Sequence, residues 1–193
     1  HGNEDGMLAT TDDINQLAGI NDATVSNEPL YAEAFGKLDG DTLTHQDLIE
    51  AVAGINDLSD VINYGILATA TLTQGELEAI GITGLDSVST ALIANQIETG
   101  ELKTIADIQA AVDGLSAILE DIHGNGDGAP ASAAVINQLA GMENATEGNE
   151  PLYAEAFGKL DGETLTNQDL IATVAAVNAL EDVITNGSLA TAT

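Results

Sequence analysis

The stretch NEPLYAEAFGKLDG occupies residues 27–40 and returns, letter for letter, at residues 149–162. The two copies are 122 residues apart. At this spacing roughly two thirds of residues 1–71 recur in residues 123–193, whereas residues 72–122 occur only once. The sequence therefore predicts a tandem repeat with a period of about 122 residues, of which one and a half units are present.

The repeat divides the chain into three predicted helical segments. Residues 1–71 are the first part of one copy, residues 72–122 are its second part, and residues 123–193 are the first part of the next copy. Because each set of short helices buries its apolar face against a neighbour, the middle segment can pack with either side. The folded unit is then either 1–122 or 72–193.

The fold class follows from the spacing of apolar residues. They recur every three and four positions through residues 105–122 and 48–62, and over shorter stretches within 30–38 and 88–97. This spacing places them on one face of a helix. Strand-like alternation is nearly absent. We therefore expect an all-α chain, a bundle of short helices in each module.

Capping signals mark where these helices begin and end. A Thr followed three residues later by Asp or Glu can form a reciprocal capping box. Asn27, before Glu28 and Pro29, is a predicted N-cap, and Gly65 and Gly187 are predicted left-handed C-caps. The four predicted boxes are Thr44 with Asp47, Thr73 with Glu76, Thr104 with Asp107, and Thr166 with Asp169.

The composition excludes several classes of partner. The 193 residues carry 32 acidic and 3 basic side chains, a formal net charge of −29. Nucleic acid and anionic membrane surfaces are not expected to bind, because both require Lys and Arg. No apolar run approaches the ~20 residues of a membrane span, so no membrane insertion is expected. The start at His1, without a leader, indicates a fragment or a processed product.

Two loops that begin His-Gly-Asn are the first candidate site, for Ca²⁺. In HGNEDG (1–6), Asn3 and Asp5 precede a glycine as in a calcium-binding loop, and Asp12 lies at the twelfth position. In HGNGDG (123–128), Asn125 and Asp127 match them, and Asp121 just upstream is a further candidate ligand. The alternative is a Gly/Asn/Asp hinge between modules that needs no metal.

Paired carboxylates in two turns are the second candidate site. Asp39 and Asp41 stand in KLDGDTLT, and Asp161 and Glu163 stand in the matching KLDGETLT. Close carboxylates can hold a cation or act as acid and base. The alternative is that they close one helix and lead to the next N-cap.

Nothing else in the sequence predicts catalysis. There is no cysteine, and the three histidines are too far apart for a zinc cluster. Between the copies, Ile55 becomes Val177 and stays apolar, whereas Ser59 becomes Glu181. Such differences reflect packing, so we expect no enzymatic activity. Tyr31 and Phe35, which lie one helical turn apart, are expected to be core residues.

The middle segment LTQGELEAIGITGLDSVSTALIANQIETGELKTIADIQAAVDGL (72–115) resembles the helical tandem repeats of large bacterial surface proteins, the BapA-like or RTX-type biofilm adhesins. The resemblance implies secretion to the bacterial cell surface, an extracellular array of many modules, and Ca²⁺ in the surroundings. It implies no catalytic residues and no required cofactor.

The expected function is accordingly structural. We expect an extracellular spacer repeat whose partners are neighbouring repeats of the same chain or identical subunits. Two alternatives remain open: an adhesive module that binds Ca²⁺ or a glycan, and a subunit of a self-assembling surface fibre or layer.

Overall fold

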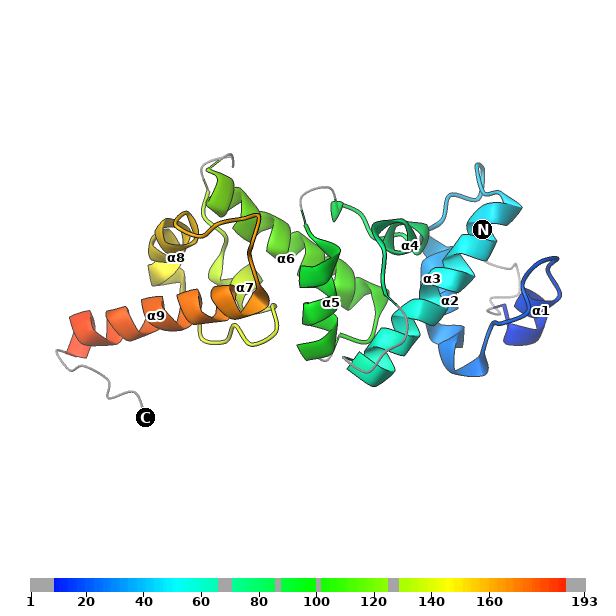
Figure 1. Ribbon diagram of the computed structural model, residues 1–193, viewed down its shortest axis with the longest axis horizontal. Coiled ribbons are helices and arrows are strands. Elements are labelled where there is room, and N and C mark those ends of the chain that lie inside the picture. The colour runs from blue at the N-terminus through cyan, green and yellow to red at the C-terminus, as the bar shows by residue number, and fades with distance from the viewer. Residues whose placement is uncertain (1–8, 66–70, 86–87, 100–101, 125–128, 187–193) are drawn as a thin grey trace. The chain divides into compact units, whose positions relative to one another are not determined.

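The structure is a computed structural model that describes residues 9–65, 71–85, 88–99, 102–124 and 129–186. Among these residues all regular secondary structure is helical, which confirms the predicted all-α class (Figure 1). The chain divides into two compact units. Unit 1 comprises His1–Leu85 and Leu102–Gln109, and unit 2 comprises Asp86–Glu101 and Ala110–Thr193. Residues 72–122, predicted as a segment of their own, contribute to both units.

Unit 1 is built around one long helix. Helix α3 packs against α2 and α4, and the side chains of Tyr31, Ile55 and Leu77 from these three helices are completely buried. The elements of unit 1 are α1 (Thr11–Asn15), η1 (Val25–Asn27), α2 (Glu28–Lys37), α3 (His45–Tyr64), α4 (Gln74–Ala79) and the first residues of α6 (Ile105–His123).

Unit 2 has its own buried core. Helix α9 packs against α8 and α5, and the core includes Tyr153, Phe157 and Leu170, all without solvent exposure. Its elements are α5 (Thr90–Thr99), the remainder of α6, α7 (Ala133–Ile136), η4 (Glu147–Asn149), α8 (Glu150–Phe157) and α9 (Asn167–Asn186).

The predicted apolar stripes form the buried helix faces. The stripe of residues 105–122 is buried from Ile105 to Leu119, and only its last residue, Ile122, is partly exposed. In α2 the rings of Tyr31 and Phe35 stack with their centroids 6.2 Å apart, but Phe35 is only partly buried. Burial of Leu, Ile and Val on one face of each helix is the main favourable contribution to the stability of both units.

All four predicted capping boxes are present. At the start of α3, the Asp47 backbone N–H donates to the Thr44 hydroxyl at 3.2 Å, and the Thr44 N–H donates to the Asp47 carboxylate at 2.7 Å. The boxes of α4, α6 and α9 have the same bonds. A fifth box, of Thr10 with Asp13, starts α1 and was not predicted.

The predicted end of α3 needs a correction in detail. Gly65 caps the helix with φ 52° and ψ −127°. The φ angle is positive as predicted, but the ψ angle lies outside the left-handed helical region, in a conformation that only glycine adopts readily. The matching prediction at Gly187 lies outside the described residues.

Asn27 is the N-cap residue of α2 as predicted, with Pro29 in the first turn, but its side chain does not cap the helix. Instead it is buried, and it donates to Oδ1 of Asn56 at 3.0 Å and accepts from the Ser59 hydroxyl at 2.8 Å. Two partners on α3 stabilise a buried amide better than one backbone N–H could.

Candidate functional site

The predicted acidic turns are turns in the structure. The Asp39 carboxylate accepts a hydrogen bond from the Asp41 backbone N–H at 3.0 Å, and the Asp161 carboxylate accepts one from the Glu163 N–H at 3.1 Å. All four side chains are exposed. A carboxylate that binds the N–H two residues onward is an Asx turn, so one acid of each pair already has a structural role.

The predicted calcium ligands are only partly within the described residues. Asn3, Asp5, Asn125 and Asp127 lie outside them. Asp12 is exposed in the first turn of α1, and the described residues bring no group of three or more His, Asp or Glu side chains within reach of one metal ion. Calcium binding therefore stays a prediction.

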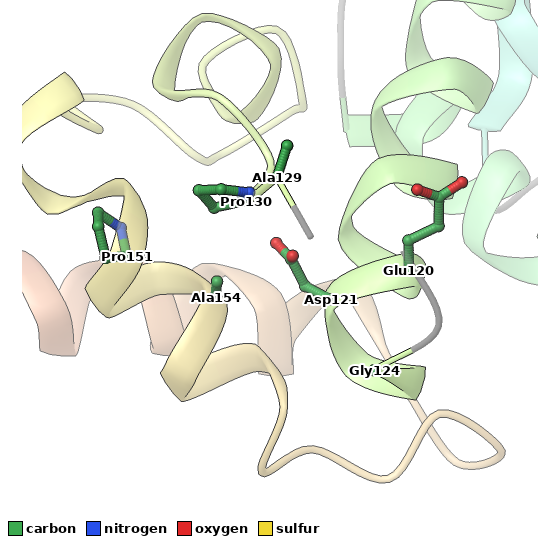
Figure 2. A pocket seen from close by; sticks show the side chains of 7 residues that line it. All are labelled: Glu120, Asp121, Gly124, Ala129, Pro130, Pro151 and Ala154. Carbon is green, nitrogen blue, oxygen red and sulfur yellow. The ribbon is translucent and has the colours of Figure 1, made fainter. Parts of the chain in front are cut away.

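Asp121 lines a cavity of about 370 Å³ in unit 2. Figure 2 shows its carboxylate directed toward Ala129 and Pro130, whereas Glu120 points away from them. One carboxylate oxygen of Asp121 accepts a hydrogen bond from the Ala131 N–H at 2.9 Å. The described lining residues are Glu120, Asp121, Gly124, Ala129, Pro130, Pro151 and Ala154. The described lining therefore combines two carboxylates with apolar groups.

A second cavity, of about 270 Å³, lies in unit 1. At its edge the Glu33 carboxylate accepts hydrogen bonds from the backbone N–H groups of Ile105 at 3.0 Å and of Ala106 at 2.7 Å. A carboxylate at a helix N-terminus satisfies free N–H groups and is attracted to the positive end of the helix dipole. The lining residues are Ser26, Asn27, Pro29, Leu30, Glu33, Ser59, Ile62, Asn63, Lys103 and Thr104.

A second glutamate caps the first helix. The Glu28 carboxylate accepts from the Thr11 N–H at 2.9 Å and from the Thr11 hydroxyl at 2.7 Å. These bonds, the backbone bond foremost, lower the pKa of Glu28. In unit 2 the Glu150 carboxylate accepts from the Ala133 N–H at 2.7 Å. Sequence reasoning missed both contacts because the partners are 17 residues apart and no local pattern indicates them.

A tyrosine hydroxyl joins loop and helix in each unit. In unit 1 the hydroxyl of Tyr31 accepts from the Thr24 N–H at 3.2 Å and donates to Asn56. In unit 2 Tyr153 bonds in the same way to the Thr146 N–H and to Asn178. Satisfying a buried hydroxyl on both sides fixes the loop on the long helix.

The two units differ where His45 is replaced by Asn167. In unit 1 the exposed His45 ring contacts the Ala18 carbonyl oxygen. In unit 2 the buried Gln96 side chain of α5 donates to Oδ1 of Asn167 and accepts from the Ala140 N–H at 2.7 Å. The substitution therefore accompanies a contact between α5 and α9.

No protein-family model matches the chain, and no curated protein and no solved structure matches it either. Within the described ranges, every helix is too short or too polar to cross a lipid bilayer.

Proposed function

We propose that the chain is a non-enzymatic spacer repeat of a large, adhesin-type protein of the bacterial cell surface. In this function the helices hold their shape by burying apolar faces, and the many carboxylates keep a long array soluble. Like-charge repulsion between neighbouring modules also favours an extended array, more strongly at low salt.

The observation that carries the proposal is the structural use of polar side chains that recur 122 residues apart. Asn15 clamps the loop at Ala23 with bonds of 3.0 Å in both directions, and Asn137 clamps Ala145 with bonds of 2.9 and 2.8 Å. Such paired bonds belong to the framework of each unit, because they fix a loop on the helix before it. Together with the resemblance of residues 72–115, they favour a repeated structural part over an enzyme.

A calcium-dependent or glycan-binding adhesive module is the alternative, and self-assembly into a fibre is another. The carboxylate of Asp121 beside its cavity is the described feature that favours cation binding most. Light scattering at micromolar protein, with chelator and with millimolar Ca²⁺, separates self-assembly from the monomeric spacer. The spacer predicts an unchanged monomer mass in both conditions, whereas growth of the mass with Ca²⁺ would favour assembly and contradict the spacer.

A further inference from the structure

Four side chains on α2 and α3 of unit 1 have identical counterparts on α8 and α9 of unit 2. We call the first set the α2–α3 face and the second set the α8–α9 face. The pairs, each 122 residues apart, are Leu30 with Leu152, Glu33 with Glu155, Leu58 with Leu180, and Ile62 with Ile184.

Two segments of unit 1 cover the α2–α3 face: α4 and the residues from Leu102 to Gln109. Helix α4 packs on α3, and Leu58 is completely buried there. Leu30 and Ile62 are half-buried and line a cavity together with Lys103 and Thr104. The second segment presents the N-terminus of α6 to Glu33, whose carboxylate accepts from two of its backbone N–H groups. These two segments of unit 1 thus cover the apolar groups and satisfy the acid.

The α8–α9 face carries the same groups without that cover. Leu180 is 50% exposed and Ile184 is 71% exposed, and Leu152 is also exposed. Glu155, which corresponds to Glu33, forms a surface ion pair with Lys159 at 2.8 Å, within its own helix. An exposed pair of this kind contributes little to stability, so Glu155 can exchange it for a helix N-terminus at little cost.

We propose that the α8–α9 face is the docking surface for second copies of residues 72–85 and 102–109, the two segments that cover the α2–α3 face in unit 1. The inference rests on the proposed repeat function and names the partner of this surface. In the docked state Leu180 lies beneath the second copy of α4, and Glu155 caps the second copy of α6.

Two differences in sequence between α3 and α9 change how the second copy of α4 would fit on α9. At Gly54 an added Cβ would lie 2.8 Å from the Glu76 carbonyl oxygen of α4, and Ala176 stands at the matching position of α9. The Asp57 carboxylate, which faces Glu76, is replaced by Ala179. The second copy of α4 must therefore shift outward at Ala176. The repulsion between the carboxylates of Asp57 and Glu76 is absent there, because Ala179 has no charge.

The experiment lengthens the full chain at Thr193 by a second copy of residues 72–122 and measures hydrogen exchange of the α9 amides. LATAT precedes residue 72 and also ends at Thr193, so the added segment follows in register. We expect exchange near Leu180 to slow about tenfold or more relative to the original chain. Unchanged exchange of α9 would overturn the proposal.

Four variants of the lengthened chain make the test specific. Leu180→Asp should abolish the slowing, Glu155→Gln should reduce it, and Glu143→Gln, an exposed loop acid, should leave it unchanged. Ala176→Gly should increase it, because the methyl group no longer holds α4 away. Slowing that survives Leu180→Asp, or that Ala176→Gly does not increase, would contradict docking in this register.

The same samples separate this inference from the proposed function. Light scattering of the original chain with and without Ca²⁺ tests the spacer function alone. A monomeric chain whose α9 exchange does not respond to the added segment would overturn the docking surface only. Self-association of the original chain with Ca²⁺ would overturn the spacer function even if the segment docks.

Discussion

The hydroxyl of Tyr31 donates a hydrogen bond to Oδ1 of Asn56, 2.6 Å away, and thereby joins α2 to α3 inside unit 1. The same hydroxyl accepts from the Thr24 N–H. One completely buried phenol therefore fixes the loop before η1 and the long helix at the same time. This contact adds a polar connection between the loop and the two helices to their apolar packing.

Replacement of Tyr31 by Phe should destabilise unit 1. The change keeps the ring but removes the acceptor of the Thr24 N–H and a donor to Asn56, which costs about 1–2 kcal/mol of unfolding free energy. Tyr153→Phe should have a similar effect on unit 2. Tyr64→Phe is the control, because Tyr64 is 62% exposed. Urea unfolding of the three variants checks the prediction, and equal stability of Tyr31→Phe and Tyr64→Phe would contradict it.

Gly54→Ala should destabilise unit 1 although alanine is the better helix former. The added Cβ would lie 2.8 Å from the Glu76 carbonyl oxygen, so α4 must move away from α3. We expect a loss of about 1–3 kcal/mol. The control is Gly36→Ala, since an added Cβ at Gly36 meets nothing within 4 Å and helix propensity should stabilise α2. Stabilisation by both changes in urea unfolding would contradict the close approach of α4 to α3 at Gly54.

Acid should weaken the capping box of α3. Bonds from the Thr44 N–H, foremost, and from its hydroxyl lower the pKa of Asp47 below its ordinary value. A pKa that is lower in the folded than in the unfolded state adds to the free energy of unfolding at pH values above the unfolded pKa. That contribution is lost as the pH falls through the folded pKa. Asp47→Asn should therefore lower the melting temperature at neutral pH and have little effect in strong acid. An equal effect at both pH values would contradict this linkage.

Asp57→Asn should change the melting temperature in the opposite direction from Asp47→Asn. Burial, and then the neighbouring Glu76, Asp60 and Asp22, raise the pKa of Asp57. A raised pKa means that the acid form stabilises the fold at low pH and that this stability is lost as the pH rises through the folded pKa. The amide should therefore raise the melting temperature at neutral pH. The gain in unfolding free energy should be about 0.5 kcal/mol or less, because Asp57 is partly exposed and water screens the repulsion. A lower melting temperature at neutral pH would contradict the prediction.

Local signals in the sequence predicted the helices well, for a physical reason. A capping box or an apolar stripe involves residues within one or two helical turns, so its pattern is visible in the sequence. Thr44 with Asp47 and the stripe of residues 105–122 are confirmed on this basis. The short α1 was missed because its five residues are too few to establish a helical period.

Contacts between distant residues could not be predicted in the same way. The bonds of Asn27 to α3 span about thirty residues, and the bond between Gln96 and Asn167 spans 71. Asn27 was assigned to the nearest helix because an N-cap is the common local role of asparagine. Its burial against Asn56 and Ser59 depends on how α2 and α3 pack, which no local pattern encodes.

In both units apolar packing stabilises the fold, and the carboxylates form turns, cap helices and keep the protein soluble. Thermal unfolding in NaCl and in CaCl₂ at matched ionic strength tests this most directly. The account predicts that both salts raise the melting temperature equally, by screening repulsion among the acids, and that chelator has no effect. A much larger rise with millimolar CaCl₂, abolished by chelator, would contradict it.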